Sequence, residues 1–164
     1  MPPADDWQTW FDRHGAALVL LARQFVNSRA DAEDIVQEAF VRFWRSRERV
    51  TDPAAFVFTC VRRCALDWQR SRRRLANREE QAARPEAERQ FADTEDTERR
   101  TAIETALREL PSEQSAVLVM KIWGGLTFAQ IAAALEIPTN TATSRYRYAL
   151  AKLREALAKE PTYE

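Results

Sequence analysis

Hydrophobic positions in the first part of the chain recur every three or four residues, which is the spacing of helices with one buried face. The first stripe is Trp7, Trp10, Phe11, His14, Leu18, Leu21 and Phe25. The second is Ile35, Val36, Ala39, Phe40, Phe43 and Trp44, and the third is Phe56, Val57, Cys60, Val61, Cys64 and Trp68. Asp52 followed by Pro53 has the form of an N-cap with proline in the first helical turn. The spacing therefore predicts three helices before residue 76.

A second group of amphipathic segments follows residue 96. A stripe of leucine and isoleucine ends at Pro111, and Ser112 is predicted to cap a helix over 113–123 that Gly124 and Gly125 terminate. Thr127 and Gln130 have the spacing of a capping box before a short helix. After a turn at 136–138, a long helix is predicted over 139–158. Its inward seam is Ala142, Tyr146, Ala149, Leu150, Leu153 and Leu157, so Tyr146 is predicted to lie in the core.

Between the two groups the charge changes sign. Residues 62–84 carry a net charge of +5, and residues 85–100 carry −3 with Phe91 as the single large apolar residue. So little apolar content cannot stabilise a packed core, and the acidic stretch is predicted to be a flexible linker. No strand pattern is present. The sequence therefore predicts an all-α protein of two small helical bundles, residues 5–76 and 97–160, joined by a linker at 77–96.

Composition narrows the function classes. The chain has 164 residues, of which 45% are hydrophobic, and its 25 basic and 25 acidic residues balance. No apolar run is long enough to span a membrane, and the N-terminus has no secretory pattern, so a cytoplasmic protein is expected. Two cysteines are too few for a disulfide scaffold. No phosphate-binding glycine loop, nucleophile elbow or paired-carboxylate pattern is present, so we expect no enzyme activity, cofactor or metal.

The last two predicted helices have the form of a helix-turn-helix. Residues 139–159 contain five basic residues against Glu155 alone. The positions opposite the seam or on its flank are Asn140, Thr141, Ser144, Arg145, Arg147 and Tyr148. A DNA-recognition helix needs such polar and cationic groups facing bases and phosphates. The alternative is an ordinary solvated amphipathic helix, and the spacing alone leaves both interpretations open.

Two longer motifs resemble one family. Residues 31–44, DAEDIVQEAFVRFW, resemble region 2 of bacterial sigma factors of the extracytoplasmic-function group. Residues 123–138, WGGLTFAQIAAALEIP, together with 144–154, resemble region 4 of the same group. Both motifs occur in the expected order with an acidic linker between them. The resemblance covers about residues 7–157 and implies promoter recognition as a dissociable subunit of RNA polymerase.

The resemblance also implies which residues contact each partner. On the region 2 helix, the polymerase-binding positions are Asp34, Gln37, Glu38 and Arg42. Promoter DNA opened at the −10 element would contact Arg47, Arg49, Arg62, Arg63, Arg70, Arg72 and Arg73. Duplex −35 DNA would contact the recognition-helix residues named above. From the residues alone, a plain solvated helix face is the usual explanation for these polar positions of the region 2 helix. An anti-sigma factor is a common partner in this group, although no residue here indicates one.

Three positions depart from the family pattern. The chain has Arg63 where asparagine is usual, Glu136 where the turn often has glycine, and Thr143 where lysine or arginine is frequent. A left-handed conformation at Glu136 would cost about 1 kcal/mol, so we expect a slightly different turn there. These departures concern details of promoter contact.

Two other functions compete with this interpretation. A stand-alone helix-turn-helix regulator would bind DNA without polymerase, but this function does not explain the polar face that Asp34, Gln37 and Glu38 form on the second helix. A redox-responsive protein would use Cys60 and Cys64, which lie four residues apart on one helical face. Both cysteines fall on the apolar stripe, which favours buried thiols over a metal or redox site.

Overall fold

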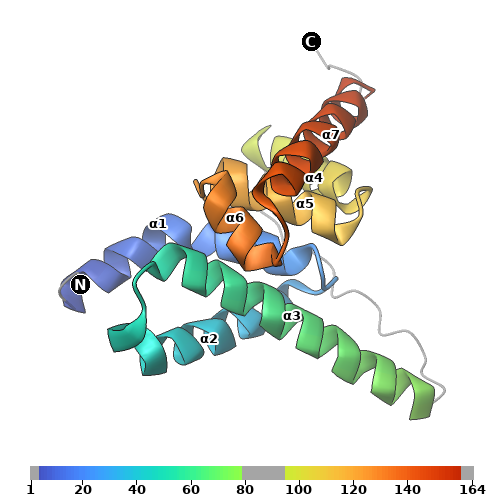
Figure 1. Cartoon of the computed structure of the whole chain (residues 1–164). Helices are drawn as coiled ribbons and strands as arrows, with labels where there is room; N and C mark the ends of the chain where they lie inside the picture. The colour runs from blue at the N-terminus through green and yellow to red at the C-terminus, as the bar shows by residue number, and fades with distance from the viewer. Residues whose placement is uncertain (1–3, 79–94, 160–164) are drawn as a thin grey trace.

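The computed structural model describes residues 4–78 and 95–159, and every regular element in these ranges is helical (Figure 1). The elements are α1 (Ala4–Arg23), α2 (Arg29–Ser46), the 3₁₀ turn η1 (Arg47–Arg49), α3 (Pro53–Arg78), α4 (Glu95–Arg108), α5 (Ser112–Leu118), the π-helical segment η2 (Val119–Trp123), α6 (Phe128–Leu135) and α7 (Thr139–Ala158). The all-α prediction is confirmed. Most of the predicted linker, residues 79–94, lies outside the described residues. No helix within the described ranges is long and apolar enough to cross a membrane.

Helices α1, α2 and α3 pack against one another as an N-terminal bundle. Leu18, Leu21, Phe43 and Val57 are fully buried in its core, as the stripes predict. Phe11 is the exception in the first stripe, because 36% of it is exposed.

Two side-chain caps fix where the helices of this bundle begin. The Ser28 hydroxyl accepts a hydrogen bond from Asp31 N at 3.4 Å, so α2 starts at Arg29. Asp52 Oδ1 accepts one from Ala55 N at 3.2 Å, which confirms the predicted cap of α3.

Helices α4 to α7 and η2 form the C-terminal part. The predicted capping box is present: Gln130 N donates to Thr127 Oγ1, and Thr127 N donates to Gln130 Oε1. The prediction that Ser112 caps its helix is wrong, because Pro111 is the N-cap and Ser112 is already helical. The predicted single helix over 113–123 is also wrong in its last turn, which widens into the π-helical η2 before Gly124. Helix α7 has the predicted bounds, and Tyr146 packs against Phe128 at 5.4 Å between ring centroids.

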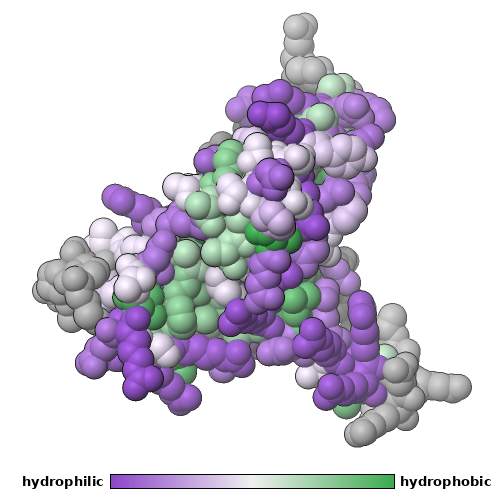
Figure 2. All heavy atoms as spheres, in the orientation of Figure 1, coloured by the Kyte–Doolittle hydropathy of each residue, from purple (hydrophilic) through white to green (hydrophobic). Residues whose placement is uncertain are grey.

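The two parts pack against each other along α3. Helix α6 lies on α3, and η2 contacts α1 (Figure 1). The buried residues of both parts form one continuous hydrophobic cluster. Figure 2 shows apolar side chains gathered in the middle of the face where the two parts meet, with hydrophilic residues toward the ends. In the described residues, the predicted two bundles are therefore joined by a packed junction.

Two helix caps interlock at this junction. Asp52 uses one carboxylate oxygen to cap α3, and its other oxygen, Oδ2, accepts a hydrogen bond from Gln130 Nε2 at 2.7 Å. The Gln130 side chain at the same time completes the capping box of α6. One hydrogen bond thus links the starts of helices that belong to different bundles.

Candidate functional site

The first candidate surface is the polar face of α2. The predicted polymerase-binding residues Asp34, Gln37, Glu38 and Arg42 are all exposed. Arg42 Nε donates to Glu38 Oε1 at 3.1 Å, and its Nη1 lies 4.0 Å from Asp67 Oδ2 on α3. The structure therefore brings the four residues onto one solvent-facing side of the helix.

Two apolar side chains extend this face, and sequence reasoning missed them. Trp44 was predicted to be buried, but 40% of it is exposed, and Val41 is 43% exposed. Phe43 fills the core instead and leaves Trp44 outside, where it stacks on Phe40 with 6.3 Å between centroids. The available signal was spacing: Val41 and Trp44 follow Gln37 by four and seven residues, so they share its line on the helix.

The second candidate surface runs along η1 and α3, where the predicted −10 arginines are spread over the length of one helix. Arg62 and Arg63 lie near its middle and Arg70, Arg72 and Arg73 lie toward its C-terminal end. At 1.5 Å per residue, Arg62 and Arg73 are about 16 Å apart along the axis. The structure does not bring all seven arginines together, but it places five of them along α3.

Several of these arginines already have partners. Arg70 Nη1 lies 3.7 Å from Asp67 Oδ1, and Arg72 Nη2 lies 3.8 Å from Asp31 Oδ2. Arg47 Nη1 donates to Trp44 O, and the guanidinium carbon lies 4.1 Å from the centroid of the Trp44 ring. Arg49 and Arg73 are exposed.

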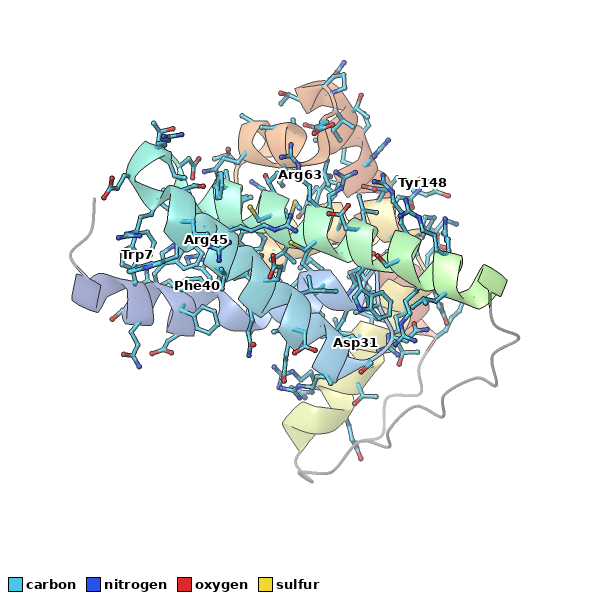
Figure 3. The ribbon with its side chains drawn as sticks, turned by 90° about the horizontal axis from the view of Figure 1, so that it is seen from below. Trp7, Asp31, Phe40, Arg45, Arg63 and Tyr148 are labelled. Atoms are coloured by element: carbon cyan, nitrogen blue, oxygen red, sulfur yellow. The ribbon has the colours of Figure 1, made fainter. Side chains whose placement is uncertain are left out.

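Arg62 and Arg63 pair with the C-terminal part of the chain. Arg62 Nη2 donates to Glu113 Oε1 at 3.0 Å, and Arg63 Nη2 donates to Glu136 Oε1 at 3.0 Å. Glu136 adopts the left-handed conformation with φ of 57°, so the expectation of a different turn at this position is wrong. Two of the three departures from the family pattern, Arg63 and Glu136, therefore contact each other. Figure 3 shows Arg63 on the side of α3 that faces α6.

The third candidate surface is the N-terminal half of α7. Asn140, Ser144, Arg147 and Tyr148 are exposed, while Thr141 and Arg145 are half-buried. The Ser144 hydroxyl donates to Asn140 O at 2.9 Å, and Lys152 Nζ lies 5.7 Å from the Tyr148 ring centroid. Among the described residues, no ion pair involves Arg145 or Arg147. This face can offer amide, hydroxyl and cationic groups to a ligand.

The two cysteines are reduced, with Cys64 buried and Cys60 half-buried. Burial raises the pKa of both thiols. Burial, with a smaller effect from Arg13, lowers the pKa of His14, whose ring lies among Trp10 and Phe58. Within residues 4–78 and 95–159, no group of three His, Cys, Asp or Glu side chains is placed to hold a metal ion.

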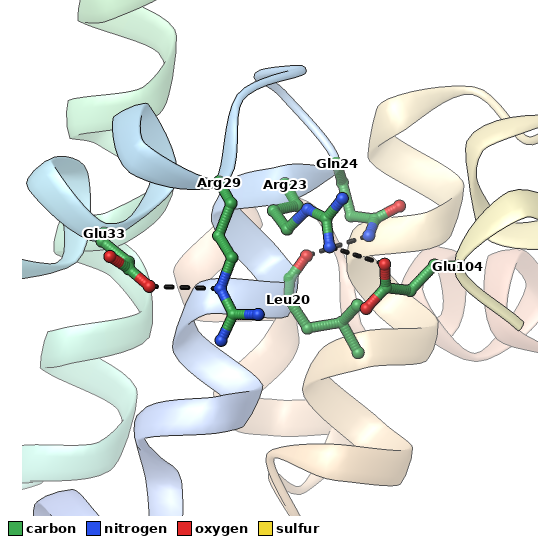
Figure 4. A network of polar contacts seen from close by, with 6 residues as sticks. All are labelled: Leu20, Arg23, Gln24, Arg29, Glu33 and Glu104. Carbon is green, nitrogen blue, oxygen red and sulfur yellow. Dashed lines mark hydrogen bonds and ion pairs between the residues drawn. The ribbon is translucent and has the colours of Figure 1, made fainter. Parts of the chain in front are cut away.

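An open groove of about 570 Å³ lies between α1, α2, α4 and η2. Phe11, Leu20, Ile103 and Trp123 supply apolar lining. Its polar wall contains the ion pairs Arg29–Glu33 and Arg23–Glu104, the second of which joins the two parts of the chain at 2.5 Å (Figure 4).

Comparison with known proteins finds two family matches along the chain. Residues 10–75 match Sigma-70 region 2, and residues 100–153 match Sigma-70, region 4. The chain is 34% identical over 157 residues to the ECF RNA polymerase sigma factor SigL of Mycobacterium tuberculosis, covering 90% of this chain and 86% of that protein. It is 31% identical to the RNA polymerase sigma-E factor of Streptomyces coelicolor, covering 86% of this chain and 80% of that one.

A solved structure has the same fold. The sigma factor RpoE of Bartonella quintana, crystallised in complex with the anti-sigma factor NepR, matches with a TM-score of 0.74. The match covers 96% of this chain and 100% of that chain at 20% sequence identity. Since the match covers 96% of this chain, the likeness extends to both helical parts.

Proposed function

The chain belongs to the extracytoplasmic-function group of sigma-70 family RNA polymerase sigma factors, and we propose that its three surfaces divide the work of promoter recognition. As a sigma factor it binds core RNA polymerase and directs transcription initiation. The polar face of α2 is proposed to bind the polymerase, the arginines of η1 and α3 the opened −10 strand, and α7 the −35 duplex. The observation that carries this assignment is the occurrence of all three surfaces on one chain, in the order of regions 2 and 4.

The α7 face has the chemistry of duplex recognition. Asn140 and Ser144 lie near the helix N-terminus, where the backbone dipole favours phosphate, and Arg147 follows on the exposed side. Arginine donates two hydrogen bonds to guanine, and asparagine can do so with adenine. The buried alanines Ala142 and Ala149 hold the opposite side of the helix against its bundle. Helix α7 is thereby presented with its polar side outward.

The arginines of α3 suit a single strand. Phosphates of an opened strand need cations at intervals along a groove or rod, and base selectivity needs an aromatic surface or a pocket. Arg63 and Arg70 are seven residues apart and share one line on the helix. Binding an opened strand in preference to a closed duplex shifts the equilibrium toward the open promoter, so the mechanism is binding and not catalysis.

Val41 and Trp44 are proposed to join Asp34, Gln37 and Glu38 in contacting polymerase. Interfaces obtain much of their binding energy from aromatic side chains that become desolvated, whereas exposed charged pairs contribute little. Trp44 is held in place by Phe40 and Arg47, so it loses little side-chain freedom on binding. Because RNA polymerase acts in the bacterial cytoplasm, we propose that this protein acts there as well. An anti-sigma factor for this chain stays a prediction.

Run-off transcription tests the proposal directly. Purified chain is added to bacterial core polymerase and a pool of genomic promoter fragments, with a no-protein control. We expect discrete start sites that depend on the chain and reveal the −10 and −35 sequences. No initiation with core enzyme from the source organism, despite retained sequence-specific DNA binding, would instead indicate a stand-alone regulator.

The polymerase-binding face is tested with charge reversal. The double variant Asp34→Lys, Glu38→Lys is expected to lose polymerase affinity while keeping its helical circular dichroism. Glu98→Lys, Glu109→Lys is the matched control, because Glu98 on α4 and Glu109 directly after this helix are both exposed, and the change of charge is the same. Equal affinity of the two double variants for core enzyme would show that the α2 face is an ordinary solvated surface and does not bind polymerase.

A further inference from the structure

One line of side chains on α7 consists of two threonines followed by an arginine. Thr139, Thr143 and Arg147 are spaced by four residues, so they follow one another along the same side of the helix. Thr139 and Arg147 are exposed, and Thr143 is half-buried. Four residues of a helix rise about 6 Å, and successive base pairs of duplex DNA are about 3.4 Å apart. Neighbours on this line therefore stand opposite base pairs that are at most about two steps apart.

The hydroxyl group of Thr143 has already used its hydrogen. Thr143 Oγ1 donates to Thr139 O at 3.1 Å, one turn back in the same helix. A hydroxyl has a single hydrogen, so the oxygen of Thr143 can only accept further hydrogen bonds. The branched Cβ allows few rotamers and this hydrogen bond selects one of them, so the side chain loses little freedom when it binds a ligand. Thr143 thus presents an acceptor oxygen beside a methyl group.

This combination of groups fits one kind of base pair. In the major groove, adenine N6 and cytosine N4 are donors, whereas guanine presents two acceptors, and thymine presents one acceptor and a methyl group. The hydroxyl oxygen can therefore accept a hydrogen bond from adenine or cytosine only. An A·T pair offers both a donor for this oxygen and a methyl group for the threonine methyl. A C·G pair offers the donor alone.

The chemistry of Arg147 is the opposite. Its side chain is exposed, and among the described residues no ion pair involves it. A guanidinium group only donates, and two of its N–H groups together match O6 and N7 of guanine. The line from Thr143 to Arg147 therefore places an acceptor one turn before a donor.

From this arrangement we infer that Thr143 determines part of the −35 sequence, because it selects an A·T base pair within about two steps of a guanine that Arg147 contacts. The inference rests on the proposed function of α7, which it extends from duplex binding to a base preference. Lysine or arginine at this position would donate instead of accept, and would select guanine. Thr143 thereby distinguishes the −35 elements of this chain from elements with guanine at both positions.

The test measures the −35 preference of the holoenzyme that the full chain forms with core polymerase. A promoter found by run-off transcription receives a randomised −35 element, and a barcode in each transcript identifies its template. Thr143→Val removes the acceptor and keeps the shape, Thr143→Ser keeps the acceptor and removes the methyl group, and Thr143→Arg introduces a donor. Thr59→Val on α3 is the matched control, because Thr59 is also half-buried and its hydroxyl donates one turn back, to Ala55 O at 2.7 Å.

Each variant has its own expected result. The wild-type chain should favour A·T about tenfold over the other base pairs at one −35 position. Thr143→Ser should use A·T and C·G equally there, and Thr143→Val should keep only about a threefold preference for A·T. Thr143→Arg should favour guanine at the same position. The control Thr59→Val should give the wild-type pattern. Should the valine variant form no holoenzyme, the serine and arginine variants still give two different expected patterns.

Two results would overturn the inference. An unchanged pattern in Thr143→Val, or an equal change on every template in Thr143→Arg, would show that Thr143 contacts no base. Arg147→Ala separates this failure from failure of the proposed function. If Arg147→Ala loses a guanine preference while the Thr143 variants keep the wild-type pattern, the inference alone is wrong. If no variant of Thr143 or Arg147 changes the pattern, α7 does not read the −35 duplex, and the proposed function of this helix is wrong as well.

Discussion

Gly124 is the position where a single methyl group should disturb the junction most. A Cβ added there would lie 2.6 Å from Met120 O, 2.9 Å from Phe58 Cζ and 3.0 Å from Leu126 Cδ1. The first neighbour is backbone, and it cannot move freely because Met120 O accepts a hydrogen bond from Leu126 N at 3.0 Å. The second belongs to a fully buried ring of α3. Gly124→Ala must therefore displace the backbone of η2, the ring of Phe58, or both.

The expected cost follows from these contacts. Overpacking of a filled core by one methyl group costs about 1–3 kcal/mol. A weakened Leu126–Met120 hydrogen bond adds about 1 kcal/mol. We therefore expect Gly124→Ala to lower the free energy of unfolding by about 2–4 kcal/mol. With a urea m-value of about 2 kcal/mol/M, the midpoint falls by about 1–2 M.

Urea unfolding followed by circular dichroism measures this loss, and Gly15→Ala is the matched control. Gly15 lies inside α1, and the nearest neighbour of a Cβ added there would be the Phe11 ring at 3.4 Å, which is an ordinary contact with a side chain that is partly exposed. Alanine in a helix interior is favoured over glycine by about 0.5–1 kcal/mol, so this variant should be slightly more stable. The reasoning about Gly124 is refuted if both variants unfold at the wild-type midpoint, or if Gly15→Ala loses as much stability as Gly124→Ala.

Three further outcomes are expected. Arg147→Ala should weaken −35 duplex binding by about 1–3 kcal/mol if Arg147 contacts a base, and equal loss on every promoter variant would limit it to phosphate. His14 has a lowered pKa, so the unfolded chain takes up its proton first and stability should fall as the pH drops below 6.5; thermal melts of His14→Gln should show a smaller fall. Cys60 and Cys64, with raised pKa values, should alkylate much more slowly at neutral pH than in the denatured chain, and rapid modification would support the redox alternative.

Local rules were sufficient to predict most of the helices. The caps at Asp52 and Thr127 and the seam of α7 depend on residues a few positions apart, and the structure confirms them. Trp44 was misassigned because two adjacent aromatic residues cannot both face the same core, and the stripe did not indicate which one would be buried. The close packing at Gly124, directly after the π-helical turn, was not predictable in the same way, because Phe58, which leaves little room for a side chain there, is distant in sequence.

The exposure of most candidate residues was predictable from the sequence, but their arrangement in space was not. Spacing identified the exposed polar positions of α2 and four of the six candidate positions of α7, since each set lies on one helix. The pairing of Arg62 with Glu113 and of Arg63 with Glu136 spans more than fifty residues of sequence, and nothing in a local charge pattern selects those partners. The Asp52–Gln130 bond joins two caps that were each predictable alone, but their contact depends on how the bundles pack.

The shared hydrophobic cluster makes the stability of the junction depend on temperature. Separating α3 from α6 and η2 brings apolar surface around Phe58 into contact with water, and hydration of apolar surface raises the heat capacity. Because apolar burial stabilises less on cooling, the two bundles are held together less firmly at low temperature, whereas the ion pairs around them respond mainly to salt. If the bundles separate when core polymerase binds, calorimetric titration of the wild-type chain with core polymerase would include this heat-capacity change. A chain whose two bundles are already separated would lack it.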